Sequence, residues 1–229
     1  MAWVKGHWQL ILITLCVFAL WQTPVMIPLK ILVVFLHELA HGLMTLVTGG
    51  KVVSLSVSPQ QGGLVVSAGG NRFLTLTAGY LGSLLIGVVL LLVALRTKAD
   101  RGVMTVFGAI MLAVAVFYIR DLFALAFTIG TGLAMLAVAR FLSQQLNDLL
   151  LRVIGLTSMI YVPYDIFSDT IARSALRSDA RMLAEEFGGT TMIWGGIWLV
   201  ISLLVIGWCL RSVLGQSSNI AWRAGGKRG

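Results

Sequence analysis

The stretch VVFLHELAHGLMTLVTGG, from Val33 to Gly50, carries three polar groups whose types and spacing suit metal chemistry. His37 and His41 are four residues apart, so on a helix their imidazoles lie one turn apart on the same face and can bind one ion. Glu38 lies about 100° around the helix from His37, close enough to contact a water molecule on that ion. This is the HExxH arrangement of zinc hydrolases, in which the glutamate is the general base.

An alternative is that these side chains only hydrogen-bond to one another inside a helix bundle. Ionisable groups in an apolar run are costly and are usually functional, which favours the metal site. A catalytic zinc takes a third protein ligand. Met44 and Val47 occupy the positions at which an extended HExxHxxGxxH motif places Gly and His, so the third ligand must come from elsewhere in the chain.

Two aspartates in the segment SMIYVPYDIFSDTIARSALR are the candidates for this third ligand. Asp169 has Arg173 four residues later, a natural ion-pair partner on a helix. Asp165 lies one turn deeper and follows Pro163, which lacks a backbone N–H and can open the helix there. We therefore predict Asp165 as the third zinc ligand and Asp169 as the alternative. A competing interpretation is that both aspartates pair with arginines. Asp179 belongs to a polar stretch, SDARMLAEEFGG, that we assign outside the spans.

The elements that must position these groups are membrane helices. Of the 229 residues, 58% are hydrophobic and 11% are charged, a composition far more apolar than that of a soluble domain. It predicts an all-α polytopic membrane protein with about six to seven transmembrane helices. We interpret residues 1–229 as one membrane-embedded domain with a core at 29–211 and a basic tail at 212–229. The apolar runs are Trp8–Ile27, Leu29–Val47, Phe73–Leu95, Val103–Ile119, Leu122–Phe141, Leu149–Phe167 and Met192–Leu210.

Between the second and third runs the pattern changes to the alternation of a strand. Apolar residues alternate with small polar ones through Val53, Leu55 and Val57, the pattern breaks at Pro59–Gly63, and it resumes at Leu64. This predicts one small β-hairpin with a glycine-rich turn, although a loop on the membrane surface would also fit. An unpaired edge of such a hairpin can bind an extended peptide.

The formal net charge of +8 is spread over the ends of the spans and is not gathered on a soluble domain. Anionic lipid headgroups are therefore the expected partner of the basic residues, and nucleic acid is not. Placing the C-terminal tail in the cytoplasm collects the larger share of Lys and Arg on that side. The sequence thus predicts a multi-pass membrane protein whose tail is cytoplasmic.

Several motifs together resemble the site-2-protease class of membrane-embedded zinc metallopeptidases. They are HELAHG in an apolar helix, the glycine-rich hairpin, AGYLGS at Ala78–Ser83 and a late intramembrane aspartate. The segment YDIFSDTIARSALRSDA, from Tyr164 to Ala180, is similar to the short B-like branch of that class, and the resemblance extends from about Val33 to Trp198.

The resemblance implies that His37 and His41 bind Zn²⁺, that Glu38 is the catalytic base, and that a late-span aspartate is the third ligand. The larger class has Gly after this aspartate, whereas Ile166 follows Asp165, so the choice between Asp165 and Asp169 stays open. The expected function is an intramembrane zinc metalloprotease acting on membrane protein or peptide substrates. The alternative is a zinc-binding pseudoprotease or membrane-protein escort without turnover. The intact Glu38 favours the enzyme.

Overall fold

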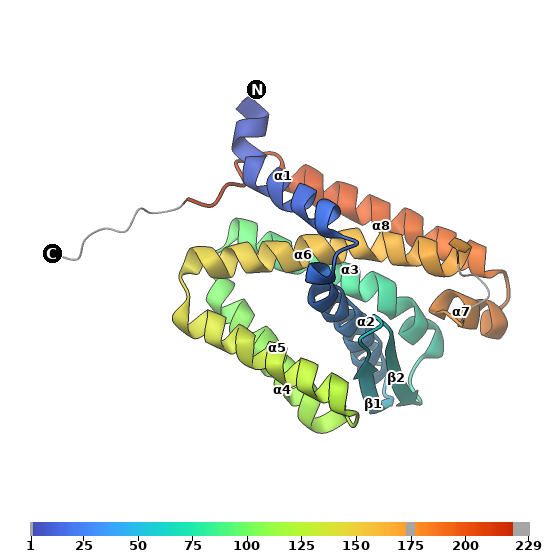
Figure 1. Cartoon of the computed structure of the whole chain (residues 1–229). Coiled ribbons are helices and arrows are strands. Elements are labelled where there is room, and N and C mark those ends of the chain that lie inside the picture. Colours follow the sequence, from blue (N-terminus) through green and yellow to red (C-terminus); the bar gives the residue numbers. More distant parts are fainter. Residues whose placement is uncertain (1, 173–176, 222–229) are drawn as a thin grey trace.

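The computed structural model describes residues 2–172 and 177–221, and nearly all of its regular structure is helical. Within this part of the chain, seven helices are long and apolar enough to cross a membrane, as the sequence predicted. Figure 1 shows the arrangement of the elements. They are α1 (Ala2–Leu20), α2 (Ile27–Val47), β1 (Lys51–Val57), β2 (Gly63–Ala68), α3 (Arg72–Arg96), α4 (Asp100–Tyr118), α5 (Leu122–Phe141), α6 (Gln144–Phe167), α7 (Asp179–Phe187) and α8 (Thr191–Val213).

Most helices begin at a short polar side chain that accepts a hydrogen bond from the first turn. Asn71, Asp121, Ser143, Ser178 and Thr190 cap α3, α5, α6, α7 and α8 in this way. The first helix differs most from its predicted bounds. It ends at Leu20, and a 3₁₀ turn at Pro24–Met26 leads into α2. The prolines explain the difference, because Pro24 and Pro28 are tolerated in the first turn of a helix but not in its interior.

Small residues let the central helices approach closely. A Cβ atom added at Gly87 of α3 would lie 2.7 Å from the Cβ of Ser158 of α6. One added at Gly155 of α6 would lie 2.7 Å from the carbonyl oxygen of Gly87. The Ser158 hydroxyl donates a 2.9 Å hydrogen bond to the carbonyl oxygen of Ser83. Helices α3 and α6 therefore form a tightly packed pair at the centre of the bundle, as small residues allow in membranes.

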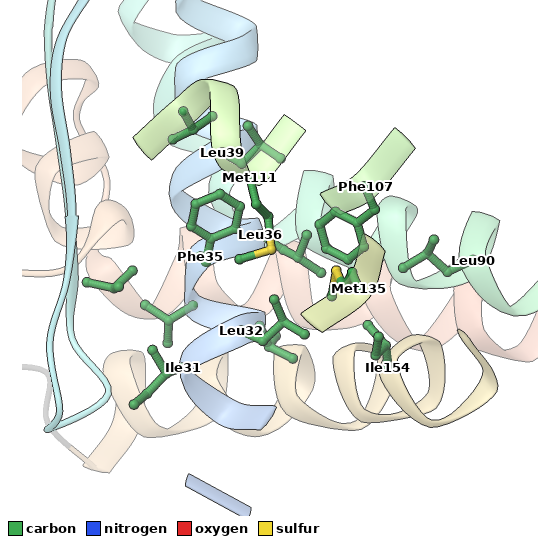
Figure 2. Packing of buried hydrophobic residues seen from close by; sticks show 14 of the residues in the cluster. Ile31, Leu32, Phe35, Leu36, Leu39, Leu90, Phe107, Met111, Met135 and Ile154 are labelled. Carbon is green, nitrogen blue, oxygen red and sulfur yellow. The ribbon is translucent and has the colours of Figure 1, made fainter. Parts of the chain in front are cut away.

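Two hydrophobic clusters lie on either side of this central pair. The α2 cluster joins α2 to α4 and α5, and Figure 2 shows Leu36 of α2 near Phe107 and Met111 of α4. The α8 cluster joins α7 and α8 to the other face of α3 and α6, and it contains Trp198 and Leu183. Helices α3 and α6 contribute residues to both clusters, so they hold the two halves of the bundle together.

The hairpin lies between α2 and α3, as predicted. Strands β1 and β2 pair in antiparallel fashion with Leu55 opposite Val65, and an irregularity occurs between Val52 and Ser54. Leu55 and Val57 are buried in the α2 cluster, so one face of the hairpin packs against α2 rather than lying on the membrane surface. Figure 1 shows the hairpin beside the C-terminal half of α2.

The end of α6 differs from the expectation that Pro163 opens the helix. Helix α6 continues through Pro163 to Phe167 and then widens into a π-helical turn at Ser168–Ala172. Arg173, the expected partner of Asp169, lies outside the described residues. The chain is not helical at residues 177 and 178, and α7 begins afresh at Asp179. Asp165 and Arg181 therefore do not lie on one continuous helix.

The segment after α8 returns to the beginning of α1. The Ser218 backbone N–H donates to the Gly6 carbonyl oxygen at 2.9 Å, and the His7 Nδ1 and Ser218 Oγ atoms lie 2.8 Å apart. The buried guanidinium of Arg152, in α6, donates to the Ser218 carbonyl oxygen and pairs with Asp148. These contacts place the start of α1 and the segment after α8 at the same end of the bundle.

Candidate metal centre

Three side chains from distant parts of the chain converge at the C-terminal half of α2. The Nε2 atoms of His37 and His41 lie 3.0 Å and 3.1 Å from the same atom, Oδ2 of Asp179. The two imidazole rings are nearly perpendicular, with centroids 4.6 Å apart. One ligand atom from each of these residues lies within 4.8 Å of the others, so the group could hold a metal ion.

His41 is oriented from the side opposite Asp179. Its Nδ1–H donates a 2.6 Å hydrogen bond to the carbonyl oxygen of Thr75, in the first turn of α3. A carbonyl oxygen can only accept, so the bond assigns a proton to Nδ1. The lone pair of Nε2 in the neutral ring then points toward His37 and Asp179, which is the orientation that a metal-binding histidine requires.

Helix α7 brings Asp179 to the histidines. The Ser178 hydroxyl accepts a hydrogen bond from the Arg181 N–H and thereby fixes the first turn, in which Asp179 lies. Ala180 and Leu183 on the next turns are fully buried in the α8 cluster. Phe73 of α3 packs edge-on against Phe187 at a centroid distance of 5.4 Å. The short helix, labelled in Figure 1, is therefore anchored near both ends by these side chains.

The carboxylate at the histidine pair was expected to be Asp165. Asp165 and Asp169 both line the cavity at the site, but among the described residues neither belongs to the group formed by the histidines and Asp179. Asp169 accepts a 2.6 Å hydrogen bond from the hydroxyl of Tyr80. The difference arises because α7 packs against α3 and thereby brings Asp179 to the histidines. We therefore transfer the proposed third ligand from Asp165 to Asp179.

The chemistry of this donor set fits a divalent cation. With the His41 proton held on Nδ1, the Nε2 lone pair faces a carboxylate oxygen at 3.1 Å, so a second proton or a metal ion must lie between these two acceptors. Burial disfavours the charged form of Asp179, but the imidazoles of His41 and His37 hold the pKa of its carboxyl well below the ordinary value. Two imidazoles and one carboxylate are also a ligand set that Zn²⁺ takes in catalytic sites.

A glycine of α3 leaves room for the three ligand groups. A Cβ atom added at Gly79 would lie 2.4 Å from Nε2 of His37 and 2.5 Å from Nε2 of His41. Such distances are shorter than any real Cβ contact. The glycine of the AGYLGS motif is thus required at this position because the backbone of α3 passes directly over the histidine nitrogens.

Glu38 lies between α2 and the hairpin and is only 6% exposed. Its carboxylate lies near the backbone of Val65, in β2. A Cβ atom added at Gly63 would lie 2.3 Å from Oε1 of Glu38, so the start of β2 also depends on a glycine. The hairpin therefore covers the carboxylate that stands beside the two histidines in the sequence.

A cavity of about 660 Å³ joins these parts. Its walls come from α2, the whole of β2 between Gly63 and Ser67, the beginning of α3, the end of α6 and the residues around Asp179. The histidines, Glu38 and Asp179 all line it. In the described part of the chain β2 pairs with β1 alone, so one edge of β2 is free, and its residues from Gly63 to Ser67 line this cavity.

Comparison with known proteins gives one match. A family model described as Peptidase M50B-like matches residues 10–209, which is most of the chain and includes every residue of the candidate centre. No curated protein and no solved structure matches the chain.

Proposed function

Because the chain belongs to the Peptidase M50B-like family, the B-like branch of the site-2 proteases, we propose that it is an intramembrane zinc metalloprotease. The observation that carries this proposal is the convergence of His37, His41 and Asp179 on one point beside Glu38, in a cavity among apolar helices. The family is one of membrane peptidases, and its members imply substrates that are themselves membrane proteins.

In this proposal His37, His41 and Asp179 hold the metal. Zinc bound by these residues would supply an acidified water and would polarise the carbonyl of the scissile bond. Gly79 keeps the space open, and the Thr75 carbonyl keeps the His41 lone pair directed into it. The neighbouring apolar residues of α2, among them Leu36 and Leu39, are buried.

Glu38 is the proposed general base. Its carboxylate accepts the proton of the attacking water and then delivers it to the nitrogen of the leaving amine. The carboxylate is buried beside the start of β2, where Gly63 leaves room for it. The free edge of β2 is the proposed binding site of an extended substrate segment, since strand addition there would place a peptide along the cavity beside Glu38.

The experiment that tests this function compares wild-type protein with Glu38→Gln. Purified protein in detergent is assayed for zinc content and for cleavage of a model transmembrane peptide. Glu38→Gln is expected to keep its zinc and lose turnover by a factor of about 100 or more, because the amide cannot accept the proton. Glu185→Gln is the matched control, since Glu185 is exposed on α7 and pairs with Arg181.

The same experiment separates the enzyme from the alternative. Zinc in the wild-type protein with no cleavage of any transmembrane peptide would favour an escort without turnover. Cleavage by Glu38→Gln at the wild-type rate would show that Glu38 is not the base.

We also propose that the basic end of the bundle faces the cytoplasm. Arg96, Lys98 and Arg101 are exposed at the same end as the segment that follows α8, since Arg96 donates to the Ser212 carbonyl oxygen. This supports contact with anionic headgroups at that face and a cytoplasmic tail. Residues 222–229 of the tail lie outside the described residues.

A further inference from the structure

Tyr80 is a buried residue at the candidate centre to which neither the sequence motif nor the proposed chemistry assigns a role. It follows Gly79 in α3 and is 2% exposed, although it borders the cavity. Its ring is nearly perpendicular to the imidazole of His37, at a centroid distance of 4.7 Å. On another side the ring packs against Trp198 of α8, at 5.3 Å.

The hydroxyl of Tyr80 is also fixed. It donates a 2.6 Å hydrogen bond to Oδ2 of Asp169, in the π-helical turn at the end of α6. A short bond between a hydroxyl and a carboxylate in a buried setting is stronger than a bond between neutral groups. Asp169, Tyr80 and His37 therefore form a continuous chain of contacts from α6 through α3 to α2.

The two histidines differ in how their rings are held. His41 has the Thr75 carbonyl oxygen on its Nδ1, whereas among the described residues the hydrogen bond of His37 is the one from Nε2 to Asp179, itself a proposed ligand. A bond to a fellow ligand cannot orient His37 independently. The ring that contacts His37 from α3 is Tyr80.

We propose that Tyr80 is the positioning residue of His37 and that Asp169 holds Tyr80 in place. This inference rests on the proposed function, because the group being positioned is a metal ligand. Metal-binding histidines depend on such supports, whose loss typically weakens binding by about 10–100-fold. It also gives Asp169 a role at the centre without making it a ligand.

The test is a zinc-affinity measurement by chelator competition on the full-length protein. Tyr80→Leu removes the ring and is expected to weaken zinc binding by about 100-fold. Tyr80→Phe and Asp169→Leu each break the hydroxyl–carboxylate bond and are expected to weaken it by roughly tenfold. The double variant Tyr80→Phe/Asp169→Leu should bind zinc no more weakly than either single variant, because both changes remove the same interaction.

Two further variants separate positioning from a general loss of structure. Asp169→Asn keeps an acceptor for the hydroxyl, so its zinc affinity is expected to stay within about threefold of wild type, unlike that of Asp169→Leu. Tyr161→Phe is the matched control, because Tyr161 is a buried tyrosine of α6 that packs on Trp21. Melting temperatures of all variants are recorded, and Tyr80→Phe and Asp169→Leu decide the question if Tyr80→Leu does not fold.

The outcomes distinguish this inference from the proposed function. Wild-type affinity in Tyr80→Phe and Asp169→Leu, or losses that multiply in the double variant, would overturn the role of Tyr80 while the zinc protease stands. A wild-type protein that binds no zinc would overturn both. If Tyr80→Phe and Asp169→Leu both bind zinc weakly and Asp169→Asn binds it almost as tightly as wild type, the result supports the chain of contacts from Asp169 through Tyr80 to His37.

Discussion

At the scale of single residues, the candidate centre depends as much on a missing side chain as on those present. A methyl group at Gly79 would fall within 2.5 Å of a nitrogen atom of each histidine. We expect Gly79→Ala to lower zinc content at least tenfold, since the ligands must move apart to admit it. Gly207→Ala in α8 is the control, because a Cβ there meets nothing within 4 Å. Zinc measured per purified protein checks this, and a fully loaded Gly79→Ala protein would contradict the geometry.

The identity of the carboxylate ligand is a second prediction at this scale. Asp179→Asn is expected to lose zinc and activity together, because an amide oxygen is a poor substitute for a carboxylate on zinc. Asp165→Asn should retain the metal, since Asp165 lines the cavity but stands apart from the group formed by the histidines and Asp179. Metal analysis of the two variants side by side checks it. Zinc lost only from Asp165→Asn would restore the assignment made from the sequence.

The sequence reveals the histidine pair but not its carboxylate, for a physical reason. His37, Glu38 and His41 lie within one helical turn, so their spacing alone determines their relative placement. Asp179 is 142 residues from His37 in the chain, and its approach depends on how α7 packs. The available signal was Ser178 before Asp179, a typical helix start, but it was interpreted only as part of a polar stretch.

At the scale of elements, α7 carries the proposed ligand Asp179 and is held by two kinds of contact. Phe73 packs between Phe187 and Trp194, while Arg72 pairs with Glu186 at an exposed site. We expect Phe73→Ala to weaken zinc binding about tenfold through the displacement of Asp179.

Arg72→Gln is the matched comparison for this prediction. An exposed ion pair contributes only about 0–1 kcal/mol, so zinc affinity should stay within about threefold of wild type. Chelator competition measures both variants. Equal losses in the two would mean that the ion pair holds α7 as firmly as the aromatic contacts do.

The long helices and the hairpin were predictable because each has a pattern that spans the whole element. Apolar runs of membrane length gave the seven long helices, and the alternation around Leu55 gave β1 and β2. The nine residues of α7 are too few for such a pattern. The path of α6 through Pro163 was also not predictable, because a membrane helix can either break or continue at a proline.

At the scale of the whole molecule, the directions of the helices limit the number of membrane crossings. Helix α1 runs in the same direction as α6: its start lies at Ser218 beside Arg152, and Trp21 packs on Tyr164. Helix α6 is antiparallel to α3, because Asp169 bonds Tyr80 while Ser158 packs on Gly87.

Helix α2 is antiparallel to α3 as well. Thr45 contacts Thr75, and Ala40 lies against Gly82. It follows that α1 and α2 run in the same direction, joined by the six residues 21–26. Two full crossings in one direction would need a return path of about 30 Å. Six residues reach at most about 21 Å. Helices α1 and α2 therefore make one net crossing between them.

We accordingly expect six net crossings, with both ends of the described chain on one face and the hairpin on the other. Single cysteines at Lys5, Lys98 and Gln216, in a background of Cys16→Ser and Cys209→Ala, should react with a membrane-impermeant maleimide from the same side. A cysteine at Lys51, exposed at the base of the hairpin next to the end of α2, should react from the opposite side. Labelling of Lys5→Cys and Gln216→Cys from opposite faces would mean seven crossings. The labelled face also tests whether the tail is cytoplasmic.

The origin of the three proposed ligands in two different hydrophobic clusters affects how the molecule unfolds. The histidines stand on α2, whose apolar side chains belong to the α2 cluster, while Asp179 precedes Ala180 in the α8 cluster. An ion shared by these side chains would be a cross-link between the two halves of the bundle. It would couple their unfolding into one cooperative event and would stabilise the native state in proportion to the logarithm of the free metal concentration. A proteolytic centre placed at this junction would then also be the point at which metal supply sets the lifetime of the folded protein.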